Sequence, residues 1–390
     1  MNEIRDFLAS HHKDILSFLT DIVAIPSYDS NIRDVAKRVE QELRKLGFQE
    51  IHYAPYGDLV AKIGNGERKL LYDSHLDTVG VGDKKEWSFD PFSAKIQDGV
   101  MYGRGVVDEK GSTPPMIYGI KAAHDFGLLD GFTAYYFGSI EEWCEGLSAQ
   151  VFVETENVQP DYVVIGEPTD LRVVRGHKGR VEFRVTAHGR SAHGASHWLG
   201  DNALYKMAPV LEAVRDLDQR LPDDPFMGRG SIVATSIDVQ AGSYNVVPDR
   251  CSIVLDRRLT TGETAEAALT QVRDLLPNED FDIQVINYDR PSYNGCVRDH
   301  PQVFPVWSLD ESHPLIRSAV ENSRRLDLDT NTGKWNFSTN GAYWAGVAGI
   351  PSVGFGPGEE EVVHTVDEHI RVEDVLLAAQ WYAQLPGLIK

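Results

Sequence analysis

The sequence predicts an α/β protein with a mixed, mostly parallel, doubly wound domain into whose chain a ferredoxin-like α+β domain is inserted. Apolar runs near 70–75, 132–139 and 161–166 each end in polar residues, as buried parallel strands do. From 179 the chain alternates apolar and polar residues, which is typical of a half-buried antiparallel strand. The chain has 390 residues, more than the roughly 250–300 at which a single core stops growing, so we expect two domains.

The first domain begins with helices and strands in alternation. Amphipathic patterns predict helices over 2–24 and 31–46, with Gly47 as the C-cap of the second. Short strands are expected near 49–53 and 58–63, ahead of the apolar strands. Ligands of open α/β sheets bind outside the carboxyl ends of the strands, so the polar residues found there are the candidate site.

The inserted domain is predicted from the order of its elements. The expected order is a strand at 179–188, a helix at 202–219, strands at 231–240 and 250–258, a helix at 264–276 and a strand at 282–288. This β-α-β-β-α-β order is that of ferredoxin-like domains. The α/β pattern returns from about 310. We therefore assign 1–177 and 300–390 to the first domain and 178–299 to the insertion.

The composition excludes several classes of protein. A formal net charge of -21 argues against nucleic-acid binding, which needs a basic face, but leaves the substrate open. No apolar run approaches the ~18–20 residues of a membrane span, and 1–20 has no signal-peptide core. The chain has only three cysteines, Cys144, Cys251 and Cys296. Their odd number and wide spacing argue against a disulfide framework and a thiolate zinc site. We expect a cytoplasmic protein with no nucleic-acid or membrane partner.

His75 and Asp77 end the first apolar strand. Residues two apart on a strand point to the same side, and a metal-binding histidine usually has its second nitrogen held by a carboxylate. Asp77 is therefore placed to hold His75. Asp108 lies in the glycine-rich segment 103–111, where the backbone can approach a ligand closely and a carboxylate can bridge two cations. The Gly-Lys-Ser/Thr order of a phosphate-binding loop is missing.

Further acidic and imidazole side chains follow the later strands. Glu141 and Glu142 come after the strand at 132–139, and because neighbours point different ways, one can bind metal while the other acts as a base. Glu167 ends the next apolar strand, and His364 follows a glycine-rich turn. Taken singly, each also fits a solvated turn, a surface position or, for His364, a structural histidine. Taken together, they favour zinc or a related ion with an open coordination position.

These residues stand in blocks that resemble the M20 metallopeptidase family, the group of acetylornithine deacetylase and succinyl-diaminopimelate desuccinylase. The blocks are SHLDTV at 74–79, GRGVVDEKG at 103–111, EE at 141–142, GEPT at 166–169 and HTVDE at 364–368. They follow the family order across nearly the whole chain. Runs at 141–146, 176–180 and 337–341 are most similar to a subgroup of hydrolases named for a link to selenium metabolism, a name that defines no substrate.

The resemblance implies a co-catalytic centre with two Zn2+ per subunit, for which Co2+ or Mn2+ can substitute. Carried over residue by residue, it implies that His75, Asp108 and Glu167 bind one metal. It further implies that Asp108, Glu142 and His364 bind the other, so that Asp108 is the bridge.

The same resemblance implies the catalytic roles in the first domain. Asp77 would orient His75, and Glu141 would be the general base. Some relatives that resemble aminopeptidases and carboxypeptidases have aspartate in place of Glu167. The glutamate in this chain therefore favours deacylation.

The resemblance makes the inserted domain a lid through which the chain forms a homodimer. His193, in the block at 189–194, is similar to the histidine that reaches into the partner subunit's site, where it would stabilise the oxyanion. Asn245 and Arg258 match positions that grip the substrate carboxylate. Arg257 competes with Arg258, because strand alternation lets only one of the two face inward.

We predict that the chain hydrolyses the amide bond of a small-molecule substrate, an N-acyl amino acid, with metal-activated water. One alternative is a dipeptidase or carboxypeptidase of the same family. Another is a metal-bound binding protein without turnover. The intact Glu141 argues against the binding protein, because a pure binder needs no base.

Overall fold

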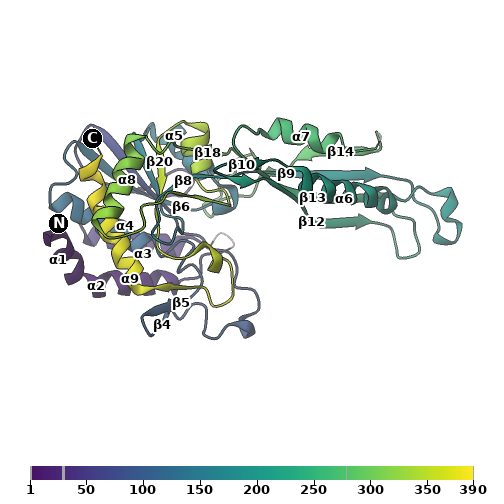
Figure 1. The fold of residues 1–390 in the computed structure, drawn as a ribbon. Helices are drawn as coiled ribbons and strands as arrows, with labels where there is room; N and C mark the ends of the chain where they lie inside the picture. The colour runs from purple at the N-terminus through teal and green to yellow at the C-terminus, as the bar shows by residue number, and fades with distance from the viewer. Residues whose placement is uncertain (1, 29–30, 278, 390) are drawn as a thin grey trace.

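The computed structural model describes residues 2–28, 31–277 and 279–389, apart from the side chain of Glu142. Figure 1 shows a broad first lobe, which holds both chain ends, and a narrow second lobe that extends from one side of it. Within the described residues, no helix combines the length and the apolar character that crossing a membrane requires.

The first lobe is built on a nine-stranded mixed sheet. Its strands, in spatial order, are β1 (Gln49–Tyr53), β2 (Leu59–Gly64), β6 (Phe132–Ser139), β3 (Arg68–His75), β7 (Tyr162–Ile165), β20 (Ser352–Gly354), β8 (Val174–His177) and β18 (Trp307–Ser308), with β19 (Gly333–Trp335) also paired to β8. The central strands β6, β3, β7 and β20 are parallel, whereas β2, β8 and β18 run antiparallel to the neighbours nearer the centre. The carboxyl ends of the parallel strands therefore meet along one edge of the sheet.

Helices cover both faces of this sheet. They are α1 (Asn2–Ser10), α2 (His12–Val23), α3 (Arg33–Lys45), α4 (Thr113–Asp125), α5 (Leu147–Glu156), α8 (Pro314–Arg325) and α9 (Val372–Gln384). Leu70 and Tyr72 of β3 enter the apolar core shared with α2, α4 and α9, whereas Leu71 enters another core with Phe152 of α5. The two-residue period of the strand thus buries the sheet on both faces, and the predicted doubly wound fold is confirmed.

A small antiparallel sheet lies at the side of the first lobe. It consists of β4 (Lys95–Gln97), β5 (Val100–Tyr102) and β21 (His369–Arg371), with β5 in the middle. Because Tyr102 lies opposite His369, the segment that follows β5 meets the segment that precedes β21.

The second lobe is an antiparallel sheet packed against two helices. The strands lie in the order β12 (Ser231–Gln240), β13 (Arg250–Leu259), β9 (Gly179–His188) and β14 (Phe281–Val285), with β17 (Val303–Phe304) also paired to β9. The helices α6 (Ala203–Arg220) and α7 (Ala265–Arg273) share one apolar core with this sheet. The chain order β9-α6-β12-β13-α7-β14 is the ferredoxin-like order expected from the sequence. The remaining short strands are β10 (Asp223–Asp224) with β11 (Gly228–Arg229), and β15 (Asn287–Tyr288) with β16 (His300–Pro301).

The chain passes between the lobes twice, and the two passages lie side by side. β8 leads into β9, and the returning chain runs from β17 into β18. β17 pairs with β9 and β18 pairs with β8, both antiparallel, so that Phe304 lies opposite Arg180 and Trp307 opposite His177. The second lobe is therefore joined to the first by one two-stranded connection.

Candidate metal centre

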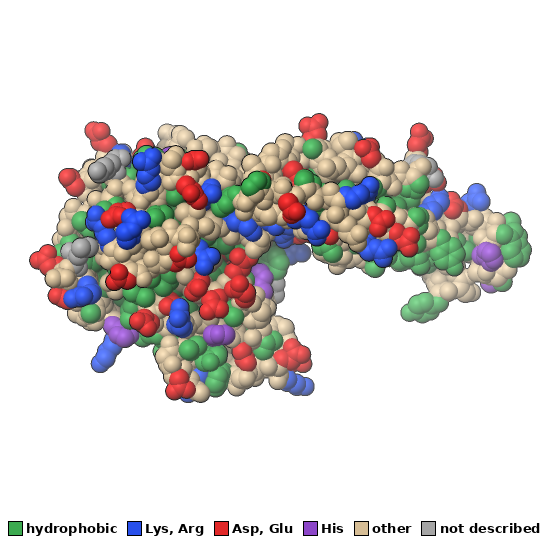
Figure 2. Space-filling view, in the orientation of Figure 1, with side chains coloured by type: hydrophobic (Ala, Val, Ile, Leu, Met, Phe, Trp, Pro, Cys, Tyr) green, Lys and Arg blue, Asp and Glu red, His purple; other side chains and the backbone are tan. Residues whose placement is uncertain are grey.

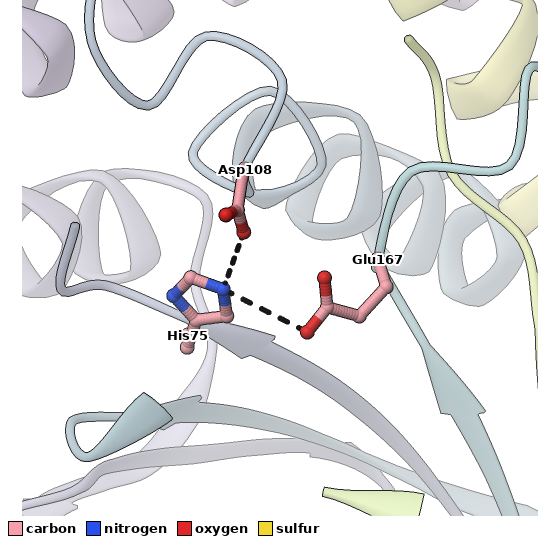
Figure 3. Close-up of side chains that lie close together, drawn as sticks. All are labelled: His75, Asp108 and Glu167. Carbon is pink, nitrogen blue, oxygen red and sulfur yellow. Dashed lines mark hydrogen bonds and ion pairs between the residues drawn. The ribbon is translucent and has the colours of Figure 1, made fainter. Parts of the chain in front are cut away.

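Three side chains meet at the carboxyl edge of the large sheet. His75 is the last residue of β3, Glu167 follows the neighbouring strand β7, and Asp108 lies in the loop that leads to α4. Because β3 and β7 are parallel, their ends bring His75 and Glu167 to the same edge. Figure 3 shows the Asp108 and Glu167 carboxylates turned toward the same ring nitrogen of His75.

The distances within this group fit a shared cation. His75 Nε2 lies 2.9 Å from Asp108 Oδ1 and 3.8 Å from Glu167 Oε1, and one ligand atom of each residue lies within 4.8 Å of the others. All three side chains are buried. His75 Nδ1 lies 2.9 Å from the backbone oxygen of Asp77, a contact that requires an N–H, so a neutral ring turns the lone pair of Nε2 toward two carboxylates. Such an arrangement needs a positive charge among the three groups, and a metal ion bound there would supply it.

His364 approaches Asp108 from the other side. Its Nε2 lies 2.7 Å from Asp108 Oδ2, while Oδ1 faces His75. Burial acts to raise the pKa of Asp108, but hydrogen bonds to His364 and His75 outweigh it and hold that pKa below its usual range. Asp108 therefore stays ionised between two imidazoles, as a bridging ligand would. The side chain of Glu142, the remaining predicted ligand, lies outside the described residues.

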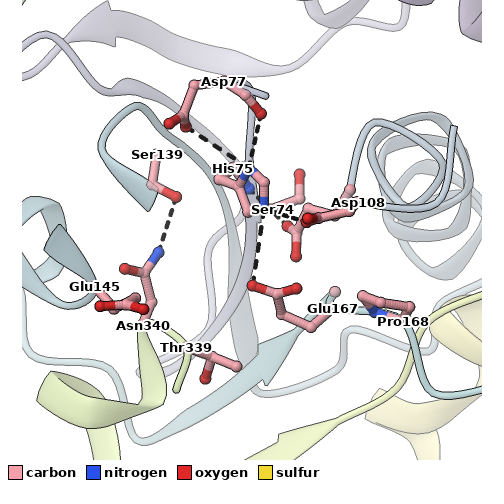
Figure 4. Close-up of polar contacts among 12 residues, drawn as sticks. Ser74, His75, Asp77, Asp108, Ser139, Glu145, Glu167, Pro168, Thr339 and Asn340 are labelled. Carbon is pink, nitrogen blue, oxygen red and sulfur yellow. Dashed lines mark hydrogen bonds and ion pairs between the residues drawn. The ribbon is translucent and has the colours of Figure 1, made fainter. Parts of the chain in front are cut away.

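Asp77 contacts His75 in a way that differs from the expectation. His75 Nδ1 donates its hydrogen bond to the backbone oxygen of Asp77, whereas the carboxylate Oδ1 of Asp77 lies farther away, at 3.6 Å (Figure 4). The strand argument does not apply because β3 ends at His75, so Asp77 no longer follows the alternation of a strand. Asp77 still holds the ring, mainly through its main chain.

Glu141, the predicted general base, is buried beside this group. It follows β6, whose last residue, Ser139, lies opposite His75 in the sheet. The Tyr288 hydroxyl, from β15, donates a hydrogen bond of 2.5 Å to Glu141 Oε2. Burial, together with the charge of Asp77, raises the pKa of Glu141 to about 8. A carboxyl group with such a pKa is suited to accept and release a proton near neutral pH.

Two contacts at the centre were not predicted. One is the Tyr288 hydroxyl, which no local pattern indicates, because it lies 147 positions from Glu141 in the chain. The other is Glu368, which is fully buried and accepts a hydrogen bond from Arg104 and two from the backbone beside Asp108. The HTVDE block at 364–368 contains Glu368, but nothing in the sequence pairs it with Arg104.

Comparison with known proteins identifies the family. The model of "Peptidase family M20/M25/M40" matches residues 71–386. The chain belongs to this family. It is therefore a hydrolase of a family that acts on amide and peptide bonds.

Several similar proteins span nearly the whole chain. "Uncharacterized protein YgeY" of Escherichia coli (strain K12) is 38% identical over 96% of this chain and 94% of its own length. Succinyl-diaminopimelate desuccinylase of Magnetococcus marinus is 27% identical, with 88% of this chain and 90% of the relative covered. Acetylornithine deacetylase of Vibrio parahaemolyticus is 28% identical, with 88% of each chain covered.

Solved structures of the M20 family share this fold. The metallo-carboxypeptidase Sso-CP2 from Sulfolobus solfataricus has a TM-score of 0.75 at 18% identity, with 96% of this chain and 99% of that chain covered. The Bacillus subtilis YXEP protein, described as a dinuclear metal binding peptidase, has a TM-score of 0.71 at 14% identity, with 98% and 99% covered.

In this M20 chain, the runs at 141–146, 176–180 and 337–341 lie together at the junction of the lobes. The Thr339 N–H donates to His177 Nδ1 at 2.9 Å. Glu145 accepts from Ser338 Oγ at 3.0 Å and from Arg180 Nη1 at 3.3 Å. Figure 4 shows Glu145 and Thr339 in the same view as the candidate metal ligands His75, Asp108 and Glu167, and Glu145 shares a cavity wall with Asp108. The three runs therefore form one network between the metal centre and the second lobe.

The cavity at the metal centre includes Arg258 and not Arg257. It has a volume of about 360 Å³, and its walls include Asp108, His364 and Arg258. Asp256 accepts two hydrogen bonds from the Arg258 guanidinium, at 2.7 and 3.0 Å. Arg257 is fully buried inside the second lobe, where it pairs with an acidic side chain. Alternation along β13 therefore turns Arg258 to the cavity.

His193 and Asn245 lie together, but the structure does not bring them to the metal centre of their own chain. The Gly194 N–H donates to the Asn245 carbonyl at 2.7 Å. β9 leads away from the junction of the lobes for ten residues before His193 is reached. At ~3.3 Å per residue this strand spans roughly 33 Å. Figure 1 shows the chain beyond β9 at the far tip of the second lobe.

Proposed function

We propose that the chain is a dinuclear-metal amidohydrolase that removes the acyl group from a small N-acyl amino acid. The observation that supports this most strongly is the buried Asp108 carboxylate between His75 and His364, with Glu141 buried beside them. A protein that only bound metal would need the ligands but no buried carboxyl group of raised pKa. Relatives named as a desuccinylase and a deacetylase support removal of an acyl group.

We infer two Zn2+ per subunit, for which Co2+ or Mn2+ can substitute. His75, Asp108 and Glu167 would hold one ion, and Asp108, Glu142 and His364 the other. When bound, the two ions would polarise the scissile carbonyl and lower the pKa of a water molecule. The similar structure described as a dinuclear metal binding peptidase supports two ions.

The side chains around the centre have distinct roles in this proposal. Glu141 takes a proton from the attacking water at its carboxylate and returns it to the leaving nitrogen. The Tyr288 hydroxyl fixes the direction of that carboxylate. Arg258 pairs with the substrate carboxylate, and Asp256 holds its guanidinium toward the cavity.

A homodimer formed through the second lobe would complete the site. His193 Nδ1 accepts the Ala195 N–H at 3.0 Å, so in the neutral ring Nε2 is the N–H donor that an oxyanion requires. His193 and Asn245 would act in the site of the partner. Figure 2 shows hydrophobic side chains gathered at the far end of the second lobe. Large exposed hydrophobic side chains of this lobe include Trp198, Leu199, Tyr205, Val233, Ile237 and Tyr244. An apolar surface of this kind supports a protein–protein contact.

Replacing the general base tests the proposal directly. The Glu141→Gln enzyme should bind as much metal as the wild type but hydrolyse N-acyl amino acids at least ~10²-fold more slowly, because an amide cannot take the proton. Metal content by elemental analysis and initial rates measure the two effects. Glu154→Gln, on the exposed face of α5, is the matched control. Full activity of Glu141→Gln would remove Glu141 as the base.

A dipeptidase or carboxypeptidase is the second candidate. The similar structures include a metallo-carboxypeptidase and human carnosine dipeptidase 1, which favour this reading at the level of the fold. Rates on N-acetyl, N-succinyl, N-formyl and N-carbamoyl amino acids, compared with rates on dipeptides, decide between the candidates. Faster hydrolysis of dipeptides would replace the deacylase assignment, and no hydrolysis of either class would favour a binding protein.

A further inference from the structure

Two loops that meet at the metal centre are tied together at both ends. One loop runs from Arg104 to Asp108, and the other from His364 to Glu368. At one end, His364 Nε2 lies 2.7 Å from Asp108 Oδ2. At the other end, Arg104 Nη1 lies 2.7 Å from Glu368 Oε2. Each loop therefore supplies one predicted metal ligand and one partner of an ion pair.

Glu368 holds the loop of Asp108 through both carboxylate oxygens. Oε1 accepts the Val107 N–H at 2.8 Å and the Asp108 N–H at 3.2 Å, while Oε2 accepts from Arg104. The Glu368 side chain is fully buried, and Arg104 is only 3% exposed. A buried carboxylate with these donors fixes the main chain at the residue that stands between the two histidines.

Arg104 in turn is fixed by more than Glu368. Its guanidinium lies 5.1 Å from the centre of the Trp87 ring, and its backbone N–H donates to the Pro91 carbonyl at 2.9 Å. The Gly103 N–H donates to the Glu368 carbonyl at 2.9 Å, which continues the pairing of β5 with β21. The backbone contacts hold the two loops together without the Glu368 carboxylate. The carboxylate therefore has a more specific role than keeping the loops folded.

We propose that the Arg104–Glu368 ion pair positions Asp108 as the bridge and thereby sets the affinity of the His364 side of the centre for its metal ion. This inference rests on the proposed dinuclear function. In that function each side has one further glutamate ligand, Glu167 beside His75 and Glu142 beside His364. The His75 side differs because His75 and Glu167 are both buried where neighbouring parallel strands end, so its geometry depends less on the orientation of Asp108. The His364 side is more exposed, since the His364 side chain is 47% exposed. Its contact with Asp108 depends on the Asp108 carboxylate being turned toward it. Without the Glu368 charge, Arg104 is left as an unneutralised, buried cation in the loop that carries Asp108.

Stepwise metal binding by the full chain tests this. Calorimetric titration of the metal-free protein with Zn2+, and separately with Co2+, gives two dissociation constants for the wild type. In Glu368→Gln, the weaker dissociation constant should rise at least ~10-fold, the tighter one should stay unchanged, and metal content after dialysis should fall toward one ion per chain. Glu373→Gln, an exposed position in the first turn of α9, is the matched control and should resemble the wild type. The visible spectrum of the Co2+ protein should change for Glu368→Gln alone.

Repeating the titration in a His364→Ala variant shows which side of the centre the Glu368 substitution affects. His364→Ala should bind one ion on the His75 side, and adding Glu368→Gln to it should leave that dissociation constant unchanged. If Glu368→Gln does not fold, Arg104→Lys, which keeps the charge but loses the planar fork, is judged by the same criteria. Unchanged constants, or equal weakening of both, would overturn the inference. A wild-type chain that binds fewer than two ions would instead overturn the proposed dinuclear function.

Discussion

His177, at the junction of the lobes, is a buried histidine whose ring nitrogens have different roles. Nδ1 accepts the Thr339 N–H at 2.9 Å, so Nε2 holds the proton and donates it to the Pro305 carbonyl at 3.1 Å. Burial lowers the pKa of His177 to about 3, well below its ordinary value. The ring is therefore neutral in the folded protein near neutral pH, and a second proton would displace the Thr339 contact.

This burial should make folding less favourable in acid. Above about pH 6.5, His177 is unprotonated in both the folded and the unfolded chain, so it leaves stability unaffected there. Below about pH 6.5, the unfolded chain binds a proton at this residue that the folded chain does not. Below it, stability falls by about 1.4 kcal/mol per pH unit until about pH 3. Urea unfolding of the wild type and His177→Gln at about pH 7.5 and 5.5 measures this. Between these two pH values, the wild type should lose about 1.4 kcal/mol more unfolding free energy than His177→Gln. A difference independent of pH would contradict a neutral, buried His177.

Single residues were predictable where their chemistry follows a strand. His75 and Glu167 stand at strand ends, and the pattern therefore indicated that they meet. The choice between Arg258 and Arg257 was decided only by the structure of β13, because the sequence shows that the two point to opposite faces but not which face lies toward the cavity. The contact of Tyr288 with Glu141 depends on how β15 approaches the first lobe, and no local period encodes that.

At the scale of elements, the long apolar patterns were the most informative. The strands at 132–139 and 179–188 have the predicted bounds. The helix predicted over 2–24 is instead two helices, α1 and α2, which meet at His11. The amphipathic period continues through this break, so both helices bury the same kind of face and the pattern gave no sign of it. The short β4–β5–β21 sheet was also missed, because strands of three residues have no measurable period.

β20 contains a glycine whose place is set by packing. A Cβ on Gly354 would lie 2.1 Å from Cη2 of the Trp335 ring. That ring cannot move away easily, since its Nε1 donates to the Pro168 carbonyl at 2.8 Å, next to Glu167. Gly354→Ala should therefore lower the free energy of unfolding by about 1–3 kcal/mol and disturb the Glu167 side of the centre. Thermal or urea unfolding measures it. Gly242→Ala, whose Cβ would meet nothing within 4 Å, is the control, and equal stability of both variants would refute this packing argument.

For the whole molecule, the distance between the tip of the second lobe and the metal centre determines how subunits would cooperate. A dimer with an Asp108→Ala chain and a His193→Ala chain has one intact combination, in which the metal ligands of one chain meet His193 of the other. Each variant alone should be inactive or strongly impaired, whereas the mixed dimer should recover about half of the wild-type activity per dimer. Two affinity tags allow the mixed dimer to be purified and assayed. Absence of recovery would place His193 outside the partner's site.

The sequence predicted the two architectures but not their mutual arrangement. Hydrophobic period and element order define each sheet from local residues. The relation between the lobes instead depends on β17 and β18, two-residue strands that pair with β9 and β8 and have no recognisable pattern. The position of Arg258 in the cavity, and of Tyr288 on Glu141, follows from that pairing.

The antiparallel pairing of β8–β9 with β17–β18 has an evolutionary consequence. The chain leaves the first lobe and returns to it at neighbouring residues, since His177 lies opposite Trp307. A tight turn of about two residues would be enough to close the gap if everything beyond were excised. Exchange of the inserted segment would therefore need two crossovers, one at each passage, and would leave the loops of the first lobe that carry His75, Asp108 and His364 in place. Diversification of specificity in such a scaffold needs no redesign of its metal-binding half.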